Sequence, residues 1–306
     1  TTLLDPNLPL DDRQAQYEIV REAREKFAEA RKEYESVANL AEAEAIWKEF
    51  TANYDRTRQE NDKFFELARR LDDILQRCEV DESGKRQGLM VNTYRCRDYL
   101  GSCRAALWNA ATYAMSTVLR GASKDEFANE LNRFNSAYED FKKNVESLRR
   151  TLPRAGLAAT LVDPLIEAGE RMHKSYTEAF NKFDPSDSDF SQKVHAHLKG
   201  TVQAAAEELN KLEQIVSEHL SNTEQLVAGL QRQGLGICRQ LMQEQIGRLD
   251  QIAELLKKEG TRRANAGGTL AANLRTLMIL AAIVGVGLAA GLGMVLARSI
   301  TRPIER

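Results

Sequence analysis

Residues 276–297 read TLMILAAIVGVGLAAGLGMVLA, and they contain no charged side chain. The hydrocarbon core of a bilayer is about 30 Å thick, and an α-helix needs about 20 apolar residues to cross it. We therefore predict a transmembrane helix over residues 276–297. A basic segment with one proline, RSITRPIER (298–306), follows this helix, and a long charged sequence precedes it.

The preceding sequence has the composition of long amphipathic helices. Prolines are few, at 6 in 306 residues, aromatic residues make up only 7%, and charged residues make up 29%. The net charge is −2 and no helix face carries a basic stripe, so we expect no nucleic-acid partner.

The cysteines do not have the spacing of a zinc or haem site. They are Cys78, Cys96, Cys103 and Cys238. We expect them to be small buried apolar residues, and a bridge between Cys78 and Cys238 is the alternative in an oxidising compartment.

Apolar residues recur at alternating steps of three and four, and no strand-like alternation occurs, so we predict an all-α fold. Pro164 marks a kink or a restart in the fifth helix, and Gly234 and Gly236 mark soft points in the sixth. The predicted helices cover about 11–39, 41–78, 89–119, 124–150, 157–183 and 189–260.

The order of the helices predicts their arrangement, because short turns make successive helices antiparallel. Matching the helix lengths gives two stacked antiparallel bundles followed by one transmembrane helix. We expect a membrane-distal four-helix bundle over residues 87–222, and a membrane-proximal bundle made from residues 1–86 and 223–265. The proximal bundle has three helices, so parity predicts a further helix before residue 1, preceded by a first transmembrane span.

The segment RSITRPI (298–304), placed after a hydrophobic span, resembles the start of a HAMP domain, and Arg302 and Pro303 carry this match. The whole layout resembles the sensory half of a bacterial methyl-accepting chemotaxis protein whose ectodomain is of the four-helix-bundle or helical bimodular type. This resemblance implies a receptor in the bacterial inner membrane, with residues 1 to about 270 in the periplasm. Ligand binding outside would displace a helix by about 1–2 Å, and HAMP would pass this change to a cytoplasmic kinase pathway.

Sensors of the type that this chain resembles bind small organic acids or amino acids between helices. An arginine fork holds a carboxylate with two hydrogen bonds, and arginines crowd the helix predicted over residues 89–119. The candidate ligand-binding residues are Arg95, Arg97, Arg104, Asn109 and Tyr113. The alternative is a solvated face on which the arginines pair with acidic residues of a neighbouring helix.

Gly287 and Gly291 form a GxxxG pair in the apolar segment, which favours close helix packing in a homodimer. The alternative is that glycine is simply common in membrane helices. His195 and His197 are two residues apart and face different sides of a helix, so we expect no metal site and no cofactor.

No nucleophile–base set, phosphate loop or HExxH motif occurs, so we do not expect an enzyme. Other classes of protein carry the same features. They are a sensor histidine kinase ectodomain, a receptor that docks a periplasmic binding protein, and a membrane-tethered structural coiled-coil protein.

Overall fold

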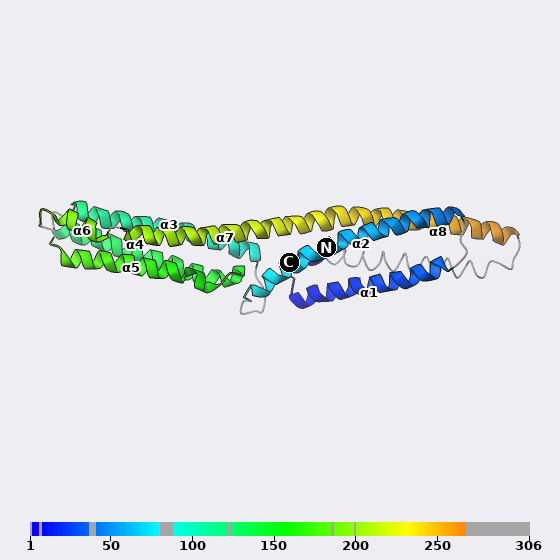
Figure 1. Cartoon of the computed structure of the whole chain (residues 1–306), viewed down its shortest axis with the longest axis horizontal. Helices are drawn as coiled ribbons and strands as arrows, with labels where there is room; N and C mark the ends of the chain where they lie inside the picture. The colour runs from blue at the N-terminus through cyan, green and yellow to red at the C-terminus, as the bar shows by residue number, and fades with distance from the viewer. Residues whose placement is uncertain are drawn as a thin grey trace. The chain divides into compact units, whose positions relative to one another are not determined.

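The structure is a computed structural model, and every regular element in its described residues is a helix (Figure 1). These residues are 2–5, 8–36, 41–79, 88–120, 124–184, 187–198 and 200–266. The fold of this part of the chain is all-α, as expected. No helix within it is both long enough and apolar enough to cross a membrane.

The predicted transmembrane helix and the start of HAMP lie outside the described residues. The residues on which those predictions rest also lie outside the described part of the chain. They are Gly287, Gly291, Arg302 and Pro303.

The chain divides into two compact units. Unit 1 comprises Thr1–Asp73 and Gln225–Arg306, and unit 2 comprises Ile74–Glu224. We expected divisions after residues 86 and 222. The stacking of two bundles and their distances from a membrane stay predictions.

Unit 1 is built around aromatic contacts between its first two long helices. The Phe27 ring lies 3.9 Å from the Tyr54 ring and 5.9 Å from the Phe50 ring. Its elements are η1 (Thr2–Leu4), α1 (Leu10–Glu35), most of α2 (Ala41–Arg77), the end of α7 (Thr201–Gln231), the π-helical segment η4 (Arg232–Cys238) and α8 (Arg239–Ala266).

Unit 2 packs its helices side by side around one continuous apolar core (Figure 1). The apolar stripe of α4 is buried in that core, with Phe134, Phe141 and Leu148 at most 1% exposed. Its elements are the end of α2, α3 (Leu89–Arg120), α4 (Lys124–Thr151), the turns η2 (Pro153–Ala155) and η3 (Ala159–Val162), α5 (Asp163–Lys182), α6 (Phe190–Leu198) and the first part of α7.

The predicted helix boundaries fail at two places. α5 begins at Asp163 rather than near residue 157. This is the restart expected at Pro164, because proline is favoured in the first turn of a helix, and the preceding residues form 3-10 turns. The single helix predicted over residues 189–260 is wrong, because Gly200 adopts φ +85° between α6 and α7. The soft points at Gly234 and Gly236 lie in the π-helical segment η4.

Candidate functional site

The candidate residues on α3 do not form one cluster. Arg104 faces α7, where its Nη2 donates to Asn210 Oδ1 at 2.8 Å and pairs with Glu213. Asn109 is five positions further along, so it lies about 140° around the helix from Arg104. Arg104 therefore pairs with an acidic residue of a neighbouring helix, which was the alternative to a role in ligand binding.

The other two arginines lie near the beginning of α3. The Arg97 guanidinium lies over the Tyr94 ring, 5.1 Å from its centroid. The Tyr94 hydroxyl donates to Glu224 on α7, and this bond raises the pKa of Tyr94. Arg95 is exposed. None of these arginines lies with Asn109 and Tyr113.

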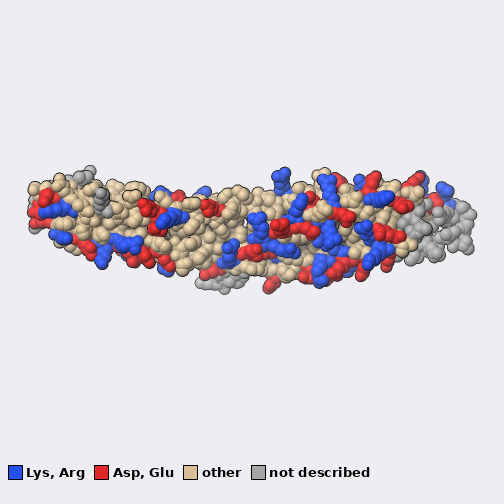
Figure 2. All heavy atoms as spheres, viewed as in Figure 1, with Lys and Arg blue, Asp and Glu red and all other residues tan. Residues whose placement is uncertain are grey.

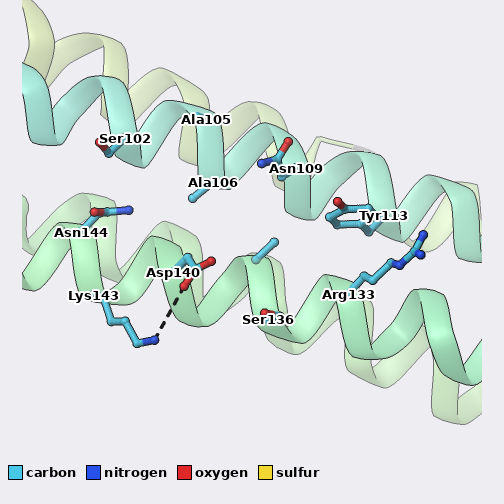
Figure 3. A pocket seen from close by; sticks show the side chains of 11 residues that line it. Ser102, Ala105, Ala106, Asn109, Tyr113, Arg133, Ser136, Asp140, Lys143 and Asn144 are labelled. Atoms are coloured by element: carbon cyan, nitrogen blue, oxygen red, sulfur yellow. Dashed lines mark ion pairs between the residues drawn. The ribbon is translucent and has the colours of Figure 1, made fainter.

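Asn109 and Tyr113 line a groove of about 490 Å³ between α3 and α4 (Figure 3). Small side chains from both helices, among them Ala105 and Ser136, leave the space that this groove occupies. The lining residues are Ser102, Ala105, Ala106, Asn109 and Tyr113 from α3, and Arg133, Ser136, Ala137, Asp140, Lys143 and Asn144 from α4.

The charges of the groove come from α4. Arg133 extends from α4 towards Tyr113 on α3, as Figure 3 shows. Its Nη1 donates to Glu130 Oε1 at 3.2 Å, and a guanidinium has five N–H donors, so donors remain for a ligand. Lys143 lies ten residues further along α4, about 15 Å along the axis. Its Nζ lies 3.7 Å from Asp140 Oδ1 (Figure 3).

The groove suits a small polar molecule that carries a carboxylate. Arg133 offers parallel N–H donors to such a group, and the Asn109 and Asn144 amides offer further donors and acceptors. The Tyr113 ring packs against the core of unit 2 and gives the groove an apolar side. The side chains of Arg133 and Lys143 are 62% and 75% exposed, so solvent screens their electrostatic attraction for an anion.

Sequence reasoning missed the residues of α4 that line this groove. The outward charges of α4 resemble those of any solvated helix face. A signal was present in Ser136, a small exposed residue on the face of α4 that also carries the charged Arg133 and Asp140. Such residues mark places where two helices leave a hollow between them.

The cysteines serve packing in this structure. All four are buried thiols, and the alternative of a disulfide between Cys78 and Cys238 is not formed. Burial raises the pKa of Cys96 and of Cys103 to about 12, so neither thiol ionises readily.

Two histidines are packed into unit 2. The His173 ring stacks on the Tyr138 ring at 4.1 Å, and its Nε2 lies 3.1 Å from Asn135 Oδ1. The His219 Nε2 donates to the Ala155 carbonyl at 2.8 Å. Within the described part of the chain, no group of three or more His, Cys, Asp or Glu residues is placed to hold a metal ion.

Comparison with protein-family models, with curated proteins and with solved structures gave no match. The candidate site therefore depends on its geometry and on the chemistry of its residues.

Proposed function

We propose that this chain is the sensory region of a chemoreceptor of the bacterial inner membrane, and that the α3–α4 groove of unit 2 binds a small extracytoplasmic carboxylate. The observation that carries this proposal is the groove itself, with a guanidinium, an ammonium group and two amides at its walls. The proposal assigns no catalysis and no cofactor to the chain.

The groove supports sensing because its walls belong to two different helices. A ligand that bonds to Arg133 on α4 and to Asn109 on α3 favours the arrangement of these helices in which both bonds form. A ligand shifts a conformational equilibrium only by its difference in affinity for the two states. Bonds that bridge two helices provide such a difference, whereas bonds to a single rigid helix do not.

The order of elements along the chain supports an output towards the membrane. α7, η4 and α8 follow one another directly from Thr201 to Ala266, and the apolar residues 276–297 come shortly after. A displacement of α7 in unit 2 would be passed along this succession to the predicted span and to HAMP. This displacement would pass through the π-helical segment η4, and π-helical turns often occur at functional sites.

Calorimetric titration of the full chain in lipid nanodiscs tests the ligand-binding step. The titrants are a panel of dicarboxylates, monocarboxylates and amino acids, each with the amide that lacks the carboxylate. We expect at least one carboxylate to bind and its amide to bind much more weakly. Arg133→Gln should weaken binding at least about tenfold, because a hydrogen bond to a charged group contributes about 1.5–3 kcal/mol.

Arg171→Gln is the matched control. Arg171 lies on α5, pairs with Glu167 at i−4 and is 65% exposed, so it resembles Arg133 in pairing and exposure but does not line the groove. Binding should be unchanged in this variant. Equal loss in both variants, or no binding by any member of the panel, contradicts the proposed site.

A further inference from the structure

The α3–α4 groove carries its charged side chains in a definite order along α4 (Figure 3). Arg133 lies at the end of the groove near Tyr113, and Lys143 lies towards the other end. Asp140 lies between them. The groove therefore presents a cation, an anion and a second cation in succession. A ligand is selected by the order of its own charges as well as by its carboxylate.

The distance between the first cation and the anion excludes compact zwitterions. Arg133 and Asp140 are seven residues apart on α4, which is about 10 Å along the helix axis. Seven residues are nearly two turns, so both positions lie within about 20° of the same helix face. An α-amino acid carries its ammonium group beside its carboxylate and cannot reach both side chains. A ligand that reaches both has its two charges at opposite ends of a chain.

The Asp140 carboxylate keeps acceptor sites for an ammonium group. Its ion pair with Lys143 has a distance of 3.7 Å from Nζ to Oδ1, which is too long for a hydrogen bond. An ionised carboxylate has about four acceptor sites on its two oxygens. An ammonium group of a ligand can therefore bond to Asp140 without displacing a hydrogen bond from Lys143.

The part of the groove between Arg133 and Asp140 is lined by small side chains. Ser136 and Ala137 lie there on α4, and Ala106 of α3 also lines the groove. Ala106 and Ala137 are each 7% exposed, so they form an apolar floor. A chain of methylene groups gains free energy when it leaves water for such a surface.

We propose that the ligand of the groove is an ω-amino acid, whose carboxylate bonds to Arg133 and Asn109 and whose ammonium group pairs with Asp140. This inference rests on the proposed function, because it names the class of carboxylate that the sensory groove binds. A dicarboxylate fits less well, since Asp140 repels its second carboxylate. Lys143, the other cation, lies about 15 Å from Arg133 along the axis of α4, beyond the reach of a short dicarboxylate.

Calorimetric titration of the full chain in lipid nanodiscs tests this order of charges. Hexanoate, 6-aminohexanoate and adipate have the same number of carbons and differ only in the group at the far end. The isomer 2-aminohexanoate has the atoms of 6-aminohexanoate, but its ammonium group lies beside the carboxylate. The same sets with four and with eight carbons find the length that fits the groove.

We expect the ω-amino acid of the best length to bind about two- to fivefold more tightly than the alkanoate of that length. The gain is modest because the side chain of Asp140 is 61% exposed, and exposed ion pairs are weak. The 2-amino isomer should bind no more tightly than the alkanoate, and the dicarboxylate should bind more weakly than the ω-amino acid.

Asp140→Asn should remove the preference for the ω-ammonium group and should strengthen the binding of dicarboxylates, because it removes the repelling charge. Glu139→Gln is the matched control. Glu139 pairs with Lys142 at i+3, as Asp140 does with Lys143, and its side chain is 56% exposed, but it does not line the groove. The preference should be unchanged in this variant.

The outcomes separate this inference from the proposed function. Carboxylate binding with no preference for the ω-ammonium group, tightest binding of a dicarboxylate, or a preference that persists in Asp140→Asn overturns the inference and leaves the carboxylate site in place. No binding by any of these carboxylates, or binding that is unaffected by Arg133→Gln, contradicts the proposed site and this inference with it.

Discussion

Unit 1 and unit 2 are both helical, yet their interiors are stabilised by different contacts. The core of unit 2 is a continuous cluster of apolar side chains from several helices. Unit 1 contains a fully buried arginine, Arg13, which pairs with Asp72, and Asp72 also accepts a hydrogen bond from Tyr17 at 2.7 Å. On the visible face of unit 1, Figure 2 shows acidic and basic side chains closely interspersed.

Polar bonds also join the helices of unit 1. The Gln245 Nε2 on α8 donates to Thr57 Oγ1 at 2.8 Å, and the Gln233 Nε2 in η4 donates to the Glu60 carbonyl at 2.9 Å. An apolar core is non-directional and tolerates small shifts, whereas a buried ion pair has a narrow geometry. The stability of unit 1 should therefore depend on a few directional contacts in addition to its aromatic packing, and that of unit 2 mainly on apolar packing.

The largest effect is expected at the buried ion pair of unit 1. Asp72→Ala leaves the Arg13 charge buried without its carboxylate, which should cost about 3–5 kcal/mol. Hydrogen exchange of α1 and α2 peptides in the full chain should report this loss, with a smaller change in α4 and α5.

Asp62→Ala is the control for that substitution. Asp62 pairs with Arg24 at 2.7 Å, but both side chains are partly exposed. Removal of such a pair should cost less than about 1 kcal/mol. If the two variants lose equal stability, Arg13 and Asp72 do not stabilise unit 1 as we infer.

A smaller effect, confined to unit 2, is expected at Gly169. A Cβ at this position would lie 2.5 Å from Phe141 Cε1, and Phe141 is 1% exposed. Gly169→Ala should therefore overpack the contact between α5 and α4 and destabilise unit 2 by about 1–3 kcal/mol. Urea unfolding, followed by exchange of α4 and α5 peptides, measures the change.

A glycine-to-alanine substitution should have the opposite effect on stability in α8. Gly247 has nothing within 4 Å of its Cβ position, so Gly247→Ala should stabilise the helix by about 0.5–1 kcal/mol. A gain of stability in Gly169→Ala would mean that α5 and α4 are not closely packed there.

The smallest expected effect is the response of unit 2 to acid. Burial lowers the pKa of His173, with a further contribution from the Lys142 charge, and burial lowers the pKa of His219. The unfolded chain then binds more protons than the folded one just below the ordinary pKa of about 6.5. Stability is present above that pH and is lost as the pH falls through it towards the lowered values.

All four histidines belong to unit 2, so acidification from about pH 7 to about pH 5 should weaken unit 2 more than unit 1. Peptide-resolved hydrogen exchange at the two pH values measures this difference. His219→Gln should reduce the loss, because it removes one of the two histidines whose pKa is lowered by burial. An equal response of the two units would exclude the buried histidines as its cause.

The helices themselves were largely predictable from the sequence. Apolar spacing places the apolar stripe of α4, including Phe134 and Phe141, in the core, because a period near 3.6 residues identifies one helix face. Gly200 was not recognised as a break, because a glycine in a periodic stretch carries no sign of whether its φ is positive.

The groove was predictable only in part. Asn109 and Tyr113 were expected at a site, but Arg133 and Lys143 were not. Which outward side chains of α3 face which side chains of α4 depends on the rotation of both helices about their axes. Periodicity shows the core face of a helix, and it does not identify the neighbour that flanks this face. For the same reason the pairing of Arg104 with Glu213 on α7 was open until the fold was known.

The most direct test of the proposed receptor is hydrogen exchange of the full chain in nanodiscs, with and without the carboxylate that binds in titration. We predict protection of the groove peptides 102–113 and 133–144, together with a ligand-dependent change in residues 239–266 of α8. Both changes should disappear in Arg133→Gln and persist in Arg171→Gln. Protection at the groove with no change in α8 would contradict transmission towards the membrane, and no protection at the groove would contradict the sensory site itself.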